Sequence, residues 1–221
     1  MKAMSDEKII KYGTPLLDGR LDDDYLASYC YVEDSLDDIK YSPLGLEKAR
    51  EIMKNTSGKV YFLHDDSYLY VCAVIRDETI CTRGKEWREN ERWPWNDDGA
   101  EFYIHFSDED CFAIHCDAHN YRAVMDTHVW GDMHNSSFVF VEYPHENWAA
   151  TIDRKKREYT VEIRIKLPDY VGVGSKVGFL LEIDDRWAVG EGSEDMVGAM
   201  YKRQGFEGTD EYDLVLGGKE I

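Results

Sequence analysis

The sequence predicts an all-β protein, a two-sheet antiparallel β-sandwich with one short helix. Apolar and polar residues alternate along many short segments, turn-forming residues separate these segments, and helical spacing is clear in one place only. Regularly spaced amphipathic strands are typical of a sandwich, because each strand buries every second side chain against the facing sheet. No repeat, low-complexity segment or Pro/Gly linker divides the 221 residues, so we expect a single domain over 1–221.

The first forty residues are acidic and irregular, and 18-DGRLDDDYL-26 is typical of a turn that leads into a short element. The helix is expected at 46-LEKAREIMKN-55, where Leu46, Ala49 and Met53 lie on one face.

A hairpin follows the helix, with strands at 59–64 and 68–77 around the turn 65-DDS-67. The inward-facing residues of its second strand are expected to be Leu69, Val71, Ala73 and Ile75. The later strands are predicted at 99–106, 111–116, 121–126, 137–143, 158–166, 176–184 and 212–216.

Strict alternation marks the stretch 95-WNDDGAEFYIHF-106. Ala100, Phe102, Ile104 and Phe106 fall on one side of the strand, and Glu101, Tyr103 and His105 fall on the other. The same reading of the other strands gives a set of residues on the sides away from the core: Glu101, Tyr103, His105, Arg122, Glu162, Arg164, Glu182 and Asp184. These residues form one polar face if their strands are neighbours, which the sequence alone does not decide.

The net charge of −19 argues against nucleic acid and acidic membrane surfaces as partners, because both require a basic footprint. The charge suits a neutral or cationic ligand, or solubility alone. The segment 1–15 has no apolar run long enough for a signal peptide. We therefore expect a cytoplasmic protein if Met1 is the natural start, and an extracellular one if a leader was removed. A monomer is compatible with the sequence.

Five motifs occur in an order that resembles carbohydrate-binding module family 9. They are 18-DGRLDDDYL-26, 60-VYFLHDDSYLYVCAVIRD-77, 96-NDDGAEFYIHF-106, 159-YTVEIRIKLP-168 and 177-VGFLLEIDD-185, and 212-YDLVLGG-218 resembles the closing strand. The chain departs from the family pattern at Tyr25, where tryptophan is usual, and at Asp184, which replaces an asparagine.

The resemblance implies a non-catalytic β-sandwich that grips a sugar or a glycan chain end between two aromatic side chains. Carried over by position, the two walls fall on Trp95 and Trp187, and the polar contacts to sugar hydroxyls fall on Glu101, Arg122 and Asp184. Tyr201 is an alternative to Trp187 as the second wall. The expected partner is a mono-, oligo- or polysaccharide, and no cofactor is required.

The chemistry of these residue types agrees with that role. A pyranose ring has an apolar C–H face that stacks on an aromatic ring, and its hydroxyls both donate and accept hydrogen bonds. Carboxylates and guanidinium groups bind hydroxyls through charge-assisted hydrogen bonds, which are stronger than neutral ones.

Other readings of the same residues stay open. The two tryptophans are equally suited to a core, and Glu101 with Arg122 to a cross-strand ion pair on a solvated sheet. A glycoside hydrolase would use Glu101 with Glu162 or Glu182 as its paired carboxylates.

Two further alternatives concern cofactors. A haem-binding sandwich would use His115, Met125 or Met133, although solvated histidines are the simpler reading. Structural calcium is carried over from the family, and its oxygen ligands would be Asp97 and Asp98 with Asp65, Asp66 or the cluster 22–24. Otherwise Asp97 and Asp98 are turn residues at the entry of a strand.

Overall fold

The computed structural model describes residues 8–81, 94, 97–107, 110–126, 140–188, 194–201 and 214–219. For residues 40, 187, 188 and 194–201 it describes the backbone alone. Trp95 and Met133 therefore lie outside the described residues, and the side chains of Trp187 and Tyr201 are not described.

The described strands form one sheet in the order β10-β11-β5-β4-β1-β14-β12-β6-β7-β8-β9, with β2, β3 and β13 attached at its sides. Their bounds are β1 Lys8–Tyr12, β2 Cys30–Glu33, β3 Ile39–Tyr41, β4 Ser57–His64, β5 Tyr68–Arg76, β6 Gly99–His105, β7 Cys111–Asp117, β8 Ala123–Asp126, β9 Phe140–Glu142, β10 Trp148–Asp153, β11 Glu158–Lys166, β12 Lys176–Ala188, β13 Glu194–Tyr201 and β14 Leu214–Leu216. The predicted hairpin of β4 and β5 and the strands predicted between 99 and 216 are present.

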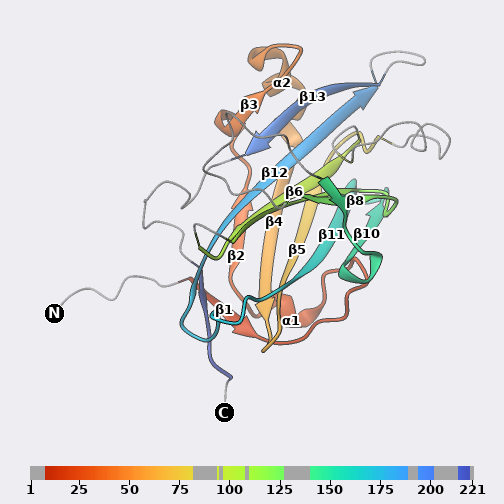
Figure 1. Cartoon of the computed structure of the whole chain (residues 1–221). Helices are drawn as coiled ribbons and strands as arrows, with labels where there is room; N and C mark the ends of the chain where they lie inside the picture. Colours follow the sequence, from red (N-terminus) through yellow and green to blue (C-terminus); the bar gives the residue numbers. More distant parts are fainter. Residues whose placement is uncertain are drawn as a thin grey trace.

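The prediction of two purely antiparallel sheets needs correction. Strand β1 pairs in parallel with both β14 and β4, so the terminal strands join the two halves into one curled mixed sheet (Figure 1). All other strand pairs in the described part of the chain are antiparallel. Local alternation is the same for a parallel and an antiparallel strand, so the sequence pattern could not reveal this closure.

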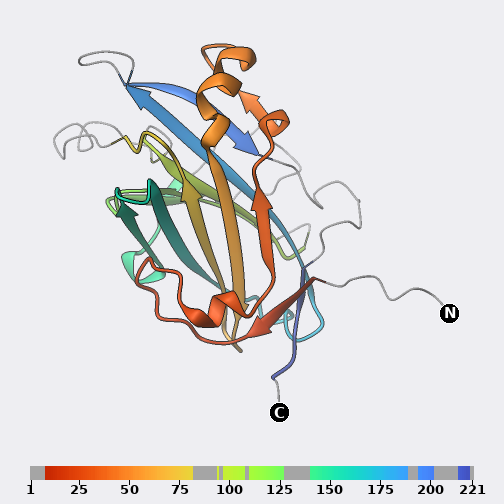
Figure 2. The same ribbon diagram turned by 180° about the vertical axis from the view of Figure 1, so that it is seen from behind.

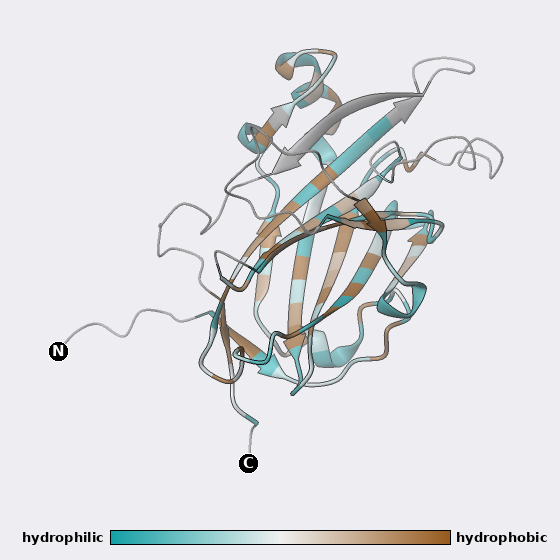
Figure 3. Ribbon diagram, viewed as in Figure 1, coloured by the Kyte–Doolittle hydropathy of each residue, from teal (hydrophilic) through white to brown (hydrophobic). Residues whose placement is uncertain are grey.

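The two halves of the sheet pack against each other around one hydrophobic core. Phe62 of β4 and Phe179 of β12 meet edge to face with ring centroids 4.8 Å apart. Side chains of β12 also pack directly against the backbone of β4, since a Cβ atom on Gly58 would lie 2.9 Å from Ile183 Cδ1. Hydrophobic and hydrophilic residues alternate along these strands (Figure 3). The inward-facing residues predicted for β5 are fully buried in this core: Leu69, Val71, Ala73 and Ile75.

The helices lie at opposite ends of the sheet (Figure 2). Helix α2 (Leu46–Ile52) continues as the 3₁₀ turn Met53–Asn55, which confirms the predicted helix. Ala49 and Met53 are buried as expected, but Leu46 at the first turn is 40% exposed. The one-turn helix α1 (Asp23–Leu26) is capped by the Asp22 side chain, which accepts hydrogen bonds from the backbone N–H groups of Asp24 and Tyr25.

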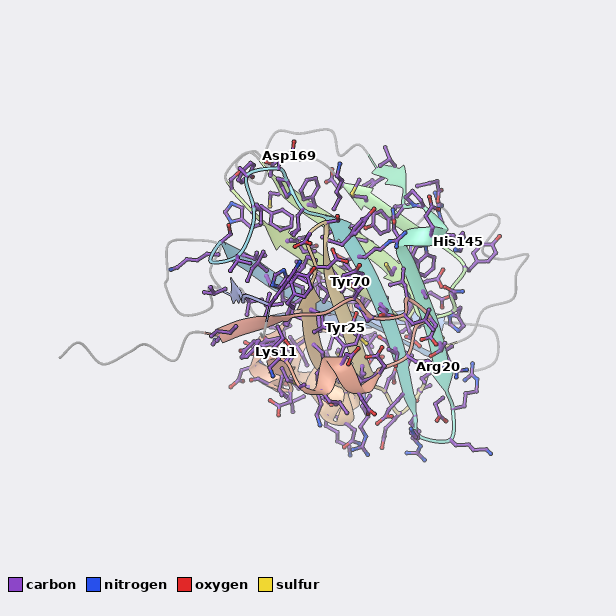
Figure 4. The ribbon with its side chains drawn as sticks, turned by 90° about the horizontal axis from the view of Figure 1, so that it is seen from below. Lys11, Arg20, Tyr25, Tyr70, His145 and Asp169 are labelled. Carbon is purple, nitrogen blue, oxygen red and sulfur yellow. The ribbon has the colours of Figure 1, made fainter. Side chains whose placement is uncertain are left out.

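A second apolar cluster covers the outer face of β4 and β5. Tyr25 of α1 packs there with Tyr61, Leu63, Tyr70 and Cys72, and Figure 4 shows Tyr25 and Tyr70 close together. The acidic N-terminal segment therefore folds across this half of the sheet and closes it from solvent.

Glu162 of β11 is fully buried beneath the same segment. Its carboxylate accepts hydrogen bonds from the N–H groups of Asp18 and Gly19, both at 3.0 Å, and from the Tyr25 hydroxyl at 2.9 Å. Burial nevertheless raises the pKa of Glu162 to about 7. The motif 18-DGRLDDDYL-26 thus has a structural role, which is to dock the first helix onto a buried acid.

Candidate functional site

The outer face of β6, β7 and β12 gathers polar side chains that alternation alone had placed away from the core. Glu182 of β12 pairs across the strands with Glu101 of β6, and Glu101 pairs with His115 of β7. Asp184 and Tyr103 lie two residues along from Glu182 and Glu101, on the same face. We call Glu101, Tyr103, His115, Glu182 and Asp184 the acidic cluster.

Hydrogen bonds connect the members of the acidic cluster. Glu101 Oε1 lies 2.8 Å from His115 Nδ1. The Tyr103 hydroxyl donates to Glu101 Oε2 at 2.7 Å and lies 3.2 Å from Glu182 Oε2. Glu101 is 7% exposed and Asp184 is 2% exposed, so the cluster is held largely out of bulk water.

The three acids differ in their protonation because their surroundings differ. Burial acts to raise the pKa of Glu101, but the charge of His115 and hydrogen bonds from His115 and Tyr103 outweigh it, so this pKa is lowered. Burial and the negative charge of Glu101 raise the pKa of Glu182 to about 8 and that of Asp184 well above its usual value. At neutral pH the cluster therefore combines an ionised acceptor, Glu101, with a carboxyl group, Glu182, that also donates.

The carboxyl group of Asp184 shares a hydrogen bond with Glu101 and leaves one oxygen buried. Its Oδ2 atom is buried and has no hydrogen-bond partner in the described part of the chain. Such an atom is costly in a folded protein unless a bound molecule or water satisfies it.

A glutamine at position 182 tests this electrostatic arrangement. Since the native state holds the Glu182 proton up to about pH 8 and the unfolded state releases it near pH 4.5, the contribution of Glu182 to stability falls as the pH rises between these values. Glu182→Gln removes this loss, so we expect its melting temperature to exceed that of the unmodified protein increasingly from pH 5 to pH 8. Scanning calorimetry across this range measures the difference, with Glu47→Gln on the exposed face of α2 as control. If the melting temperatures of Glu182→Gln and Glu47→Gln changed with pH in the same way, the raised pKa of Glu182 would be contradicted.

Arg122 lies at the edge of the acidic cluster, two residues before Val124, which pairs with His115. Its backbone N–H donates to Asp117 Oδ2 at 2.6 Å, and its guanidinium forms an ion pair with Glu142. The Glu101–Arg122 ion pair that the sequence left open does not form.

The structure describes only the backbone of two of the proposed aromatic walls. Trp95 lies outside the described residues. The backbone of Trp187 is in β12 and pairs with Asp195, and the backbone of Tyr201 pairs with Glu182 of the acidic cluster. Trp148 is 2% exposed and belongs to the core.

Sequence reasoning named His115 only as a possible haem ligand and left open whether Glu162 shares a face with Glu101. His115 is 7% exposed and bonded to Glu101, whereas histidines were expected on the solvated surface. Glu162 and Arg164 lie on β11 in the other half of the sheet, so the predicted polar face is divided in two. No local signal distinguishes these cases, because strand order decides which polar residues become neighbours.

A second group of acids lies beside the acidic cluster, between the two halves of the sheet. One carboxylate oxygen each from Asp77, Asp98 and Asp185 lies within 4.8 Å of the other two, and all three residues are buried. We call these residues the aspartate triad. Burial, with a smaller contribution from the charge of Glu78, raises the pKa of Asp77 to about 6. Burial raises the pKa of Asp98 and of Asp185 well above the usual value, and the charge of Asp77 adds to both shifts.

The aspartate triad fits the calcium that the sequence left as an option, but with other ligands than those expected. Three carboxylates supply the hard oxygen atoms that Ca²⁺ and Mg²⁺ prefer. Asp77 Oδ2 is buried and has no hydrogen-bond partner among the described residues, so an oxygen is left for a cation. Of the aspartates expected at such a site, Asp98 alone belongs to the triad.

The other expected ligands are engaged elsewhere. Asp65 accepts hydrogen bonds from four groups in the β4–β5 turn and its surroundings. Asp66 forms an ion pair with Lys219, and Asp97 Oδ2 lies 3.5 Å from His119 Nδ1. Asp22 caps α1.

One cavity of about 880 Å³ lies away from both acidic groups, on the outer face of the other half of the sheet. Its lining includes Arg20, Thr151, Arg154, Lys155 and Thr160, and Arg20 is visible in Figure 4. The candidate sugar contacts do not line it.

Among the described residues, no helix has the length and apolar character needed to cross a membrane.

Comparison with known proteins gives a family match over residues 37–212, to the model described as "Carbohydrate family 9 binding domain-like". Endo-1,4-beta-xylanase A of Thermotoga maritima is 28% identical over 94 residues, which are 42% of this chain and 7% of the xylanase. The chain thus matches a small fraction of that relative.

Two solved structures share the fold. Both are carbohydrate binding modules of family 9 from Caldicellulosiruptor kristjanssonii, one in complex with cellotriose and one with glucose. Each aligns with a TM-score of 0.60 at 16% identity over 97% of this chain; the alignment covers 95% of the cellotriose-bound chain and 97% of the glucose-bound chain.

Proposed function

This chain belongs to the carbohydrate family 9 binding domain-like family, and from that premise we propose that it is a non-catalytic domain that binds a sugar or the end of a glycan chain. The acidic cluster supports this proposal most directly. Sugar hydroxyls need donors and acceptors side by side, and ionised Glu101 beside the protonated carboxyl group of Glu182 supplies both. The buried Asp184 Oδ2 is proposed as a further hydrogen-bond partner for a hydroxyl.

Glu101, Asp184 and Arg122 are proposed as the hydroxyl contacts. The first two belong to the acidic cluster, and Arg122 lies at its edge with its side chain 27% exposed. Trp95 and Trp187 are proposed as the stacking walls, with Tyr201 as the alternative to Trp187. Register supports an aromatic at this place, since Tyr201 pairs with Glu182.

Glucose and β-1,4-linked glucose oligomers are the first ligands to test, because the two similar structures hold glucose and cellotriose. We also infer one domain over 1–221, since a single hydrophobic core contains residues from β1 through β14.

Paired carboxylates on this face do not make a glycoside hydrolase the better proposal. Such an enzyme needs its two carboxylates on either side of the scissile bond, about 5–5.5 Å or 6.5–9.5 Å apart. Glu101 and Glu182 are direct cross-strand neighbours and reach the same Tyr103 hydroxyl, so they approach a sugar from one side. Release of reducing sugar from a polysaccharide panel would contradict this view, and a Soret band in the purified protein would favour haem.

Replacement of Trp95 by alanine tests the proposed function. We expect the variant to lose retention on an array of glucose oligomers, cellulose, xylan and mannan, because stacking on one face of the sugar ring is removed. The melting temperature is expected to stay close to that of the unmodified protein. The control is Tyr170→Ala, which removes an aromatic residue that is 60% exposed and whose hydroxyl bonds to Ser107 and Asp110, outside the acidic cluster.

Two outcomes would count against this role of Trp95. A large drop in melting temperature would mark Trp95 as a core residue, and unchanged retention would exclude it as a wall.

A further inference from the structure

Basic side chains gather around one cavity although the chain as a whole carries a net charge of −19. This cavity of about 880 Å³, on the outer face of β5, β10 and β11, is lined by four cationic and two anionic side chains. The cationic ones are Arg20, Arg154, Lys155 and Lys156. We propose that this cavity, which we call the basic pocket, is a second binding site, separate from the acidic cluster, and that it takes a sugar that carries a carboxylate, a uronic acid.

The floor of the basic pocket is one row of side chains across three strands. Thr151 of β10 pairs with Thr160 of β11, and Thr160 pairs with Val74 of β5. All three are half-buried and line the cavity. Their neighbours along the strands, such as Tyr159 and Ile75, point into the hydrophobic core, so this row faces outward. The floor therefore offers hydroxyl groups beside an apolar surface, which are the two features that a sugar ring requires.

The N-terminal segment builds one wall of the basic pocket. The Gly19 N–H donates to Glu162 at 3.0 Å, and the Gly19 carbonyl accepts a hydrogen bond of 2.6 Å from the Thr151 hydroxyl. Gly19 has a φ of +74°, and a Cβ atom there would lie 3.0 Å from the backbone of Ala150, so glycine is needed for this close docking. The next residue, Arg20, is thereby held at the edge of the cavity, and Figure 4 shows it beside the strands of this half.

Two of the four cations are free to bind an anion. Within the described part of the chain, neither Arg20 nor Lys155 forms an ion pair or a side-chain hydrogen bond. The other two are partly engaged, since Arg154 donates to a backbone carbonyl at 3.1 Å and Lys156 Nζ lies 3.8 Å from Asp153 Oδ2. Asp153 also accepts hydrogen bonds from the backbone N–H groups of the β10–β11 turn. The basic pocket therefore attracts anions on a protein whose overall charge repels them.

Size and chemistry favour a sugar acid over an inorganic anion. Sites for small organic molecules have volumes of about 300–1,000 Å³, and a phosphate or sulfate ion would leave most of this cavity unfilled. The Thr160 hydroxyl has no hydrogen-bond partner among the described residues and lines the cavity, so it is available to a ring hydroxyl. A carboxylate at the edge of the same ring forms a charge-assisted hydrogen bond with Arg20. The ionised Glu101 disfavours such a ligand at the acidic cluster.

The first experiment compares ligands that differ in one group each. The whole protein is titrated in a calorimeter with glucuronate, galacturonate and trigalacturonate. Glucose and galactose are the neutral counterparts, and acetate and inorganic phosphate are anions without a sugar ring. We expect the uronates to bind saturably, and about tenfold more tightly than acetate or phosphate. A change from 0.1 M to 1 M salt shortens the Debye length from about 10 Å to about 3 Å, so we expect it to weaken uronate binding and to change glucose binding little.

The second experiment locates the site by substitution. Arg20→Gln and Lys155→Gln are each expected to weaken uronate binding about two- to fivefold, because both charges are exposed, and the double variant is expected to combine the two losses. Thr160→Val keeps the shape of the side chain and removes the hydroxyl, so we expect it to weaken the binding of uronates but not of phosphate. The matched control is Lys54→Gln, which removes an exposed charge next to α2, outside the basic pocket, and is expected to bind uronates as the unmodified protein does.

The outcomes test the basic pocket and the proposed function separately. Absence of saturable uronate binding at 0.1 M salt, or uronate binding that Arg20→Gln and Lys155→Gln leave unchanged, would overturn the whole inference. Acetate and phosphate that bind as tightly as the uronates, with no effect of Thr160→Val, would overturn the assignment to a sugar acid. If uronates bind as expected but no neutral sugar binds, the proposed function of the acidic cluster fails while the basic pocket stands.

Discussion

Replacing Glu101 with glutamine is expected to weaken sugar binding about ten- to a hundredfold while the protein stays folded. Glu101 is the member of the acidic cluster whose pKa is lowered, so it is the ionised acceptor for a sugar hydroxyl. Glutamine keeps the shape of the side chain but turns a charge-assisted hydrogen bond into a neutral one. It also leaves His115 without its carboxylate partner.

Calorimetric titration with the best-bound sugar of the array measures this effect. Glu146→Gln, at an exposed position before β10, serves as the control for loss of one negative charge. The melting temperature of Glu101→Gln should change little, because glutamine keeps the shape of the side chain and can still hydrogen-bond to Tyr103. Unchanged affinity would mean that Glu101 only positions His115.

Replacing the next residue, Phe102, with alanine is expected to lower the free energy of unfolding by about 3–5 kcal/mol. Phe102 is fully buried, and its ring centroid lies 6.4 Å from that of Phe179 across the pair β6 and β12. Its removal leaves a cavity that the close-packed core fills only in part. Urea unfolding followed by tryptophan fluorescence measures the loss.

The control for Phe102→Ala is Val141→Ala in β9, where the side chain is 42% exposed and a change below about 0.5 kcal/mol is expected. A loss below about 1 kcal/mol for Phe102→Ala would show that the inner side of β6 is not part of the main core. The two adjacent residues thus test the two faces of one strand, with sugar affinity as the readout for Glu101 and stability as the readout for Phe102.

The candidate site could be predicted in part because strand alternation is a local property. Alternation in 95-WNDDGAEFYIHF-106 correctly separated Glu101 and Tyr103 from Ala100, Phe102 and Ile104. The strands β1, β2, β3, β10 and β13 were not predicted, since acidic or irregular composition hid most of them. The structure describes the side chains of three of the five proposed sugar contacts, Glu101, Arg122 and Asp184. It brings Glu101 and Asp184 together in the acidic cluster.

The sequence by itself determined which side of each predicted strand is apolar, and hence that the chain folds as a β protein with one main core. Tertiary structure decided which polar sides meet. It placed Glu182 beside Glu101, moved Glu162 beneath Tyr25 in the other half, and brought Asp77 to Asp98 and Asp185. The physical reason is that burial of an apolar side depends on neighbours along the chain, whereas contacts between acids depend on strand order and register, which arise only when the whole sheet closes.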